Sequence, residues 1–247
     1  MRSGKSYFGI IALLTALTGC SPKEEQPASV PGSPLDGFGK YSCGTLPYSM
    51  KEIQADNGTK PILVIYLHGG SSKGNDNETQ IKEAAVSVIA RYLTDNSIPS
   101  IFIVPQCPSS ASWGAQMNEP LAKLADEYDA SCGGVYVLGG SMGGTGTWSF
   151  ANACPSKILG IMPVAGKPGA ALPENFKAMR VCTVMSEADE VMKTAYEDVR
   201  LFCERIKAAG GDAEYTIVPV SEQWSHEKTC EESYTEERLT RLFLSPN

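Results

Sequence analysis

The sequence predicts an α/β fold in which a mostly parallel sheet is covered by helices on both faces. Apolar runs alternate along the chain with longer segments of helical spacing. Several runs are continuously apolar, as in "PILVIYLHGG" (61–70), which is typical of strands buried on both faces. Glycines or a proline close these runs. Strands that alternate with helices build a mostly parallel sheet.

The expected elements follow one another without a linker after residue 40 and without an internal repeat, so residues 41–247 are predicted to form one domain. Within the helix over 118–130, Pro120 is expected in the first turn, where its missing N–H costs little. The predicted strands are 61–70, 100–106, 134–141, 158–166, 180–186 and 213–220, and the predicted helices are 78–95, 118–130, 144–154, 190–211 and 235–244.

Composition and charge exclude some classes of protein. The chain is 42% hydrophobic and 20% charged, as expected of a globular domain, and its net charge of −7 argues against a nucleic-acid binder. No CxxC motif or Cys/His cluster has metal-ligand spacing, so no metal site is predicted. Cys182 lies in an apolar run and is expected to be a buried thiol.

Residues 1–19 have the pattern of a secretory signal peptide. Basic Arg2 and Lys5 precede an apolar run over 7–17 that is too short to span a bilayer. The segment ends in "LTGC", which resembles the lipobox of bacterial lipoproteins and implies cleavage before Cys20 and lipid attachment to it. Residues 20–40 are rich in Pro, Ser, Gly and Glu and are predicted to be a flexible tether. The expected location is the bacterial cell envelope, on the outer membrane, with the domain facing the periplasm or the surface.

Ser141 is the candidate nucleophile. Residues 139–143 read Gly-Gly-Ser-Met-Gly and match G-x-S-x-G, between a predicted strand and a predicted helix, which is the context that the motif requires. The glycines remove the Cβ atoms that would clash in so sharp a turn, and the helix N-terminus favours developing negative charge. The alternative is a glycine-rich turn with a helix-capping serine.

The general base is sought among only two histidines, since a serine hydroxyl is a poor nucleophile without one. In α/β-hydrolases the order is Ser, then Asp or Glu, then His. His226 satisfies this order, whereas His68 precedes the serine and occupies the place that shapes the oxyanion hole. A surface-loop histidine is the alternative for His226.

The triad acid is expected after a strand between the serine and the histidine. "RVCTVMSEADEVM" supplies Asp189, which is the preferred candidate, with Glu187 and Glu190 as alternatives. The carboxylate would fix the histidine tautomer and stabilise the imidazolium. The oxyanion hole is predicted to use the N–H groups of Met142 and Gly70, each contributing about 3 kcal/mol.

Three motifs in order resemble the small phospholipase/carboxylesterase-like α/β-hydrolases, which are related to bacterial feruloyl esterases, polyhydroxybutyrate depolymerases and esterases described as predicted peptidases. They are "LHGGSSKGNDN" (67–77), "PQCP" (105–108) followed by Trp113, and "GGSMGGTGTWSFA" (139–151). The resemblance implies an α/β-hydrolase fold, a Ser/His/Asp triad, no metal and no organic cofactor. The usual "G-x-x-D" before the acid reads "SEAD" here.

These observations predict a serine carboxylesterase without a large lid. Its expected substrates are exported or extracellular esters, such as feruloyl or acetyl groups on plant polysaccharides. Trp113 and Trp224 are candidates for an aromatic wall around a sugar or aryl group, and a packing role is the alternative for each. The alternative functions are a serine peptidase of the same fold and a non-catalytic carbohydrate- or partner-binding lipoprotein.

Overall fold

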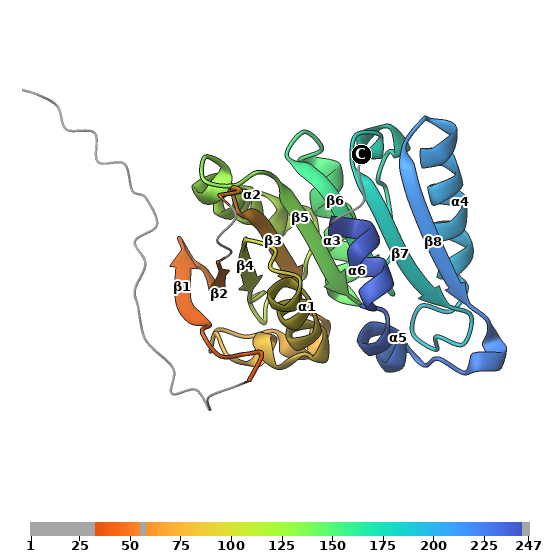
Figure 1. Cartoon of the computed structure of the whole chain (residues 1–247). Helices are drawn as coiled ribbons and strands as arrows, with labels where there is room; N and C mark the ends of the chain where they lie inside the picture. The colour runs from red at the N-terminus through yellow and green to blue at the C-terminus, as the bar shows by residue number, and fades with distance from the viewer. Residues whose placement is uncertain (1–32, 55–57, 244–247) are drawn as a thin grey trace, which may run out of the picture.

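The computed structural model describes residues 33–54 and 58–243 (Figure 1). The predicted signal peptide (1–19), Cys20 and most of the predicted tether (20–40) lie outside the described residues. Folded structure begins slightly before the predicted domain boundary, because Phe38 is buried and the first strand starts at Gly39.

The described residues form one eight-stranded sheet with the order β1-β2-β4-β3-β5-β6-β7-β8. Neighbouring strands from β4 to β8 are parallel, and only β1 with β2 and β2 with β4 are antiparallel. The predicted mostly parallel sheet is therefore confirmed. The strands are β1 (Gly39–Cys43), β2 (Leu46–Ile53), β3 (Ile62–Leu67), β4 (Ser100–Pro105), β5 (Val135–Gly140), β6 (Ile158–Val164), β7 (Arg180–Ser186) and β8 (Asp212–Val218).

The antiparallel hairpin β1–β2 is an element that the sequence analysis missed. A two-residue connection joins its strands, and Gly44 in that connection adopts a φ of 58°, which suits glycine. The rings of Tyr41 and Tyr48 stack across the pair with 5.5 Å between centroids. An edge hairpin does not need continuously apolar strands, so the pattern used to find the central strands could not detect it.

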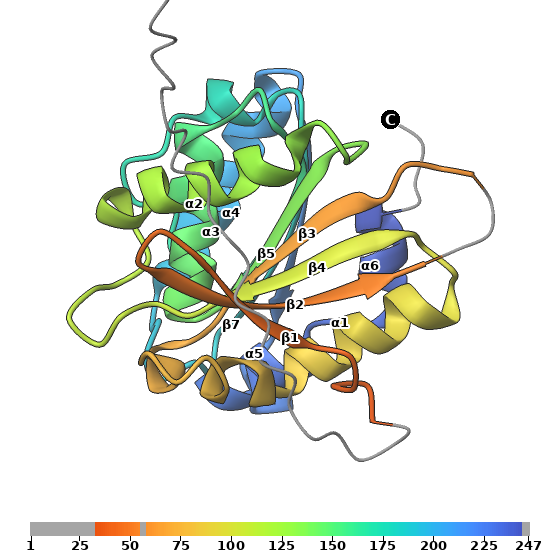
Figure 2. The ribbon, with the colours of Figure 1, turned by 90° about the vertical axis from the view of Figure 1, so that its left-hand side faces the viewer.

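Helices cover both faces of the sheet. Figure 2 shows α2, α3 and α4 on one side and α1 and α6 on the other. The core on the first side includes Trp148, Phe176 and Phe202, whose rings meet edge to face with centroids 5.4–5.5 Å apart. The helices are α1 (Ala84–Asp95), α2 (Ala115–Asp129), α3 (Met142–Ala153), α4 (Ala195–Ala208), α5 (His226–Glu232) and α6 (Glu236–Phe243), and the short 3-10 helices are η1 (Gly70–Ser72), η2 (Thr79–Lys82), η3 (Pro173–Phe176) and η4 (Val220–Glu222). No helix in these described ranges is both long and apolar enough to cross a membrane.

Helices α1, α2 and α4 begin at other residues than predicted. Helix α1 begins only at Ala84, because Thr79–Lys82 form the separate 3-10 helix η2. Helix α2 begins at Ala115, where the Met117 N–H donates to the Gly114 carbonyl, so Pro120 lies inside the helix rather than in its first turn. Helix α4 begins only at Ala195. The N–H groups of Val191 and Met192 donate instead to the Asp189 carboxylate, which keeps the preceding segment in turns.

The six parallel strands, β3 to β8, all end at the same edge of the sheet. Strands β3, β5, β7 and β8 end at Leu67, Gly140, Ser186 and Val218, and ligands in such sheets bind beyond these carboxyl ends. The segment between β6 and β7, residues 165–179, contains only the short helix η3, so the described part of the chain has no inserted lid there.

Candidate active site

Ser141 occupies the sharp turn between β5 and α3. Its backbone has φ 57° and ψ −118°, a conformation that costs a residue with a side chain of the order of 1–3 kcal/mol. The Ser141 N–H donates to the Val164 carbonyl at 3.0 Å, which ties the turn to β6. A Cβ on Gly143 would lie 1.8 Å from the Leu67 carbonyl oxygen, so only glycine lets helix α3 approach β3 this closely.

His226 is the first residue of α5 and reaches Ser141 across 85 positions of sequence. Its Nε2 atom lies 2.7 Å from the Ser141 Oγ atom. The side chain of Ser225 caps the helix by accepting from the Lys228 N–H, which fixes where the helix begins. The imidazole is 14% exposed, so it is sheltered yet accessible to a substrate.

Asp189 is the acid that the structure brings to the imidazole. Its Oδ2 atom lies 2.8 Å from the His226 Nδ1 atom, and its Oδ1 atom accepts from the Val191 and Met192 N–H groups at 2.9 and 2.7 Å. Burial of the carboxyl raises the pKa of Asp189, but the hydrogen bonds from His226 and the two backbone groups outweigh it and leave this pKa below its ordinary value. Asp189 is therefore held as a carboxylate.

The two alternative acids have other partners. Glu187 accepts from the Val220 N–H at 2.9 Å, and Glu190 accepts from the backbone N–H of His226 at 3.1 Å. Neither interaction involves the imidazole. Glu190 supports the start of α5, and the acidic partner of the ring is Asp189.

The two hydrogen bonds of the His226 ring define its tautomer. An ionised Asp189 can only accept, so the Nδ1 atom of His226 carries a proton, and Nε2 is left to accept the Ser141 hydroxyl proton. The imidazole is thus in the tautomer that a general base for serine requires.

The predicted oxyanion donors, Met142 and Gly70, lie on either side of the candidate nucleophile Ser141. Met142 is the first residue of α3, where helix N–H groups lack intrahelical partners. Gly70 opens η1 after β3 and lines the same cavity as Ser141, and a Cβ built on the neighbouring Gly69 would lie 3.8 Å from the Ser141 Cβ atom. Donation from these two groups to an oxyanion stays a prediction.

His68 is fully buried and holds the loop that contains Gly70. Its Nε2 atom accepts from the Cys107 N–H at 2.9 Å, so the proton resides on Nδ1, which donates to the Gly69 carbonyl at 2.6 Å. Burial lowers the pKa of His68 and so favours this neutral form. The structure gives His68 a structural place, as expected from its position before the serine.

The prediction that Trp113 forms part of an aromatic wall around the substrate is wrong. Its side chain is buried (3% exposed), its indole N–H donates to the His68 carbonyl at 3.0 Å, and its Cβ atom would lie 2.3 Å from a Cβ on Gly146. The ring packs beneath the loop after β3. Trp224 also lies outside the cavity lining: it packs against the core on the α1 and α6 side, with the Lys228 ammonium 5.4 Å from its ring centroid.

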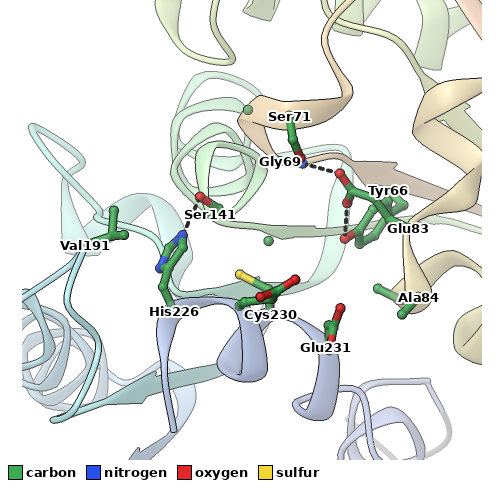
Figure 3. A pocket seen from close by; sticks show the side chains of 14 residues that line it. Tyr66, Gly69, Ser71, Glu83, Ala84, Ser141, Val191, His226, Cys230 and Glu231 are labelled. Carbon is green, nitrogen blue, oxygen red and sulfur yellow. Dashed lines mark hydrogen bonds between the residues drawn. The ribbon is translucent and has the colours of Figure 1, made fainter.

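A cavity of about 500 Å³ opens beside Ser141 and His226 (Figure 3). Glu83 also lines this cavity, and the sequence analysis did not indicate it; its carboxylate accepts hydrogen bonds from Gly69 and from Tyr66. The predicted helix over 78–95 contains Glu83, and a glutamate in a helix commonly faces solvent, so no local signal connects it to the loop after β3. The remaining lining is mixed, and comprises Ser71, Ala84, Ala85, Gly140, Val191, Glu227, Cys230 and Glu231.

Metal ions in proteins are held by groups of His, Cys, Asp or Glu side chains. No group of three or more His, Cys, Asp or Glu side chains within residues 33–54 and 58–243 is arranged to hold a metal ion. Cys182, as expected, is a buried thiol, and burial raises its pKa to about 12.

Known structures share this architecture. The chain is similar to a thermostable esterase (24% identity, TM-score 0.71), with 85% of this chain aligned to 63% of that one. It is also similar to Est1E from Butyrivibrio proteoclasticus (14% identity, TM-score 0.63), over 85% of this chain and 98% of that one. A third is a serine hydrolase without a lid from Xanthomonas campestris (16% identity, TM-score 0.58), over 81% and 91%. No family model and no curated protein sequence matches the chain.

These likenesses, together with the strand order, confirm the predicted fold class. The chain has the α/β-hydrolase fold, and Ser141 lies in the sharp turn after β5. The chain spans 63% of the length of the thermostable esterase, so that protein contains additional sequence that this chain does not match.

Proposed function

We propose that this protein is a serine hydrolase of carboxylic esters that works through an acyl-enzyme. The observation that carries the proposal is the continuous contact from Asp189 through His226 to Ser141, with 2.8 and 2.7 Å between the bonded atoms. The named esterases among proteins of the same fold support the choice of reaction class.

In the proposed acylation, the Ser141 oxygen attacks the ester carbonyl carbon as His226 Nε2 takes the hydroxyl proton. The carbonyl π electrons move to the oxygen, which accepts from the Gly70 and Met142 N–H groups. When the tetrahedral intermediate collapses, the alkoxide leaves and takes the proton from the imidazolium. Water then repeats the sequence, with His226 as base, and releases the acid from Ser141.

The proposed substrates are esters on bulky or hydroxyl-rich partners, such as feruloyl or acetyl groups on plant polysaccharide. The open cavity and the half-exposed Val191 at its rim suit an acyl or aryl group. Glu227 and Glu231 on the lining suit neutral hydroxyls better than anionic groups. A second structure of Est1E, aligned with this chain at 11% identity, contains bound ferulic acid, and this supports including feruloyl esters among the candidates.

An ester panel tests the proposal. We expect turnover of p-nitrophenyl acetate and of at least one of longer-acyl, feruloyl or acetyl-xylan substrates, with little cleavage of peptide p-nitroanilides. Activity confined to the anilides would instead favour the serine peptidase. A folded protein that hydrolyses none of these and resists fluorophosphonate labelling would favour a binding lipoprotein.

We further propose that the protein is exported and anchored through lipid on Cys20, as the "LTGC" segment indicates. In a bacterial host fed labelled palmitate, the full chain should incorporate the label and fractionate with membranes. Cys20→Ser should remove both properties and leave ester hydrolysis unchanged. Equal labelling of the two proteins would contradict the anchor.

A further inference from the structure

Glu83 lies where two parts of the chain meet beside the nucleophile. It immediately precedes α1, and its side chain lines the cavity that contains Ser141 (Figure 3). The triad chemistry described above does not use it. Its contacts nevertheless converge on the loop that supplies the predicted oxyanion donor Gly70.

The Glu83 carboxylate accepts three hydrogen bonds. Its Oε1 atom accepts from the Gly69 N–H at 2.8 Å and from the Ser72 hydroxyl at 2.6 Å. Its Oε2 atom accepts from the Tyr66 hydroxyl at 2.9 Å. A single oxygen thus bridges the two ends of the turn that contains Gly70.

These contacts fix the peptide that presents the Gly70 N–H. The Gly69 carbonyl is bound by His68 on one side, and the Gly69 N–H is bound by Glu83 on the other. A trans peptide is planar, so the direction of the Gly69 carbonyl also sets the opposite direction of the Gly70 N–H. Glycine has wide backbone freedom, and these two bonds hold Gly69 in an extended conformation with φ −72° and ψ 176°.

We propose that Glu83 is a positioning residue that holds the Gly69–Ser72 turn so that the Gly70 N–H stays directed at the oxyanion. The inference rests on the proposed ester hydrolysis at Ser141. Glu83 acts through the main chain and transfers no proton itself, because His226 already contacts the serine. Its loss should therefore weaken transition-state stabilisation more than substrate binding.

The test compares Glu83→Ala and Glu83→Gln with wild type on p-nitrophenyl acetate and on the matching thionoester. One misaligned oxyanion donor lowers kcat by up to about 10²–10³-fold. We expect Glu83→Ala to lower kcat at least tenfold with KM changed less than about threefold. Glu83→Gln keeps an oxygen for Gly69 and Ser72 and should recover much of this loss. Glu232→Gln, an exposed change of the same charge outside the cavity, should match wild type.

The thionoester separates positioning from general damage. Sulfur accepts hydrogen bonds poorly, so an intact oxyanion hole makes the oxygen ester react much faster than the thionoester. We expect this ratio to fall in Glu83→Ala as its oxygen-ester kcat falls. An unchanged kcat in Glu83→Ala, or a lower kcat with an unchanged ratio and a lower melting temperature, would overturn the proposal.

The rate of phosphonylation by a fluorophosphonate distinguishes this failure from failure of the proposed function. The phosphonyl oxygen accepts hydrogen bonds from the same oxyanion donors, and the labelling reaction requires no ester turnover. If wild type hydrolyses no ester yet Glu83→Ala is phosphonylated at least tenfold more slowly, the esterase assignment fails and the positioning role stands. If wild type hydrolyses esters and Glu83→Ala is phosphonylated at the wild-type rate, the positioning role fails and the esterase stands.

Discussion

Replacing Ser141 with alanine is expected to reduce ester turnover at least about 10⁴-fold, because the attacking oxygen is removed and the oxyanion hole and substrate binding retain only a small part of the rate enhancement. The fold should persist, since the turn is held by the backbone bond from Ser141 to Val164 and by the glycines around it. Steady-state kinetics and thermal melting measure both effects. Activity within tenfold of wild type would contradict the assigned nucleophile.

A second substitution at the same position tests the strain in the elbow. Ser141 adopts φ 57°, a conformation that costs serine or alanine more free energy than glycine, because glycine has no Cβ atom. Ser141→Gly should therefore be as inactive as Ser141→Ala but melt a few degrees higher. Equal melting temperatures in the two variants would indicate that the turn is not strained.

Replacing Asp189 with asparagine is expected to lower kcat about 10⁴-fold with little change in fold. The asparagine carbonyl can still accept from Val191 and Met192, but its amide group then faces the His226 ring. The ring must offer Nδ1 as an acceptor and carry its proton on Nε2, where it can no longer take the Ser141 proton. Glu187→Gln, which keeps an acceptor for Val220, should remain near wild type. A larger loss in Glu187→Gln than in Asp189→Asn would contradict the assignment.

The lowered pKa of Asp189 also leads us to expect that the free energy of unfolding depends on pH. Because its pKa is lowered on folding, its contribution to the free energy of unfolding is present above the ordinary carboxyl pKa and is lost as the pH falls through the lowered value. Melting temperatures measured from pH 7 down to pH 3 should fall less steeply for Asp189→Asn than for wild type. Parallel curves would contradict this linkage.

Much of the site could be predicted because its signals are local or follow chain order. The G-x-S-x-G turn lies between a strand and a helix, and only one of two histidines follows the serine. The choice of the triad acid among three carboxylates within four positions could not be made from such signals. It depends on which side chain receives the Val191 and Met192 N–H groups and reaches the imidazole, and sequence spacing does not contain that information.

The wrong or missing predictions concern interactions across long stretches of chain. Trp113 was correctly placed after β4, but the direction of its ring is set by the close approach of Gly146 and by His68. In the sequence, Glu83 resembles an ordinary residue of the predicted helix over 78–95, and only folding brings Gly69, 14 positions earlier, to its carboxylate. The hairpin β1–β2 lies at the sheet edge, where strands are not continuously apolar.

The central claim is that Ser141 becomes the acyl carrier. Its most direct test is mass spectrometry of wild-type protein quenched in acid during turnover of p-nitrophenyl acetate, followed by peptide mapping. We predict an acetyl group on Ser141 that is absent from Ser141→Ala. Acetylation of a different residue in a wild-type protein that is turning over, with Ser141 unmodified, would contradict the account.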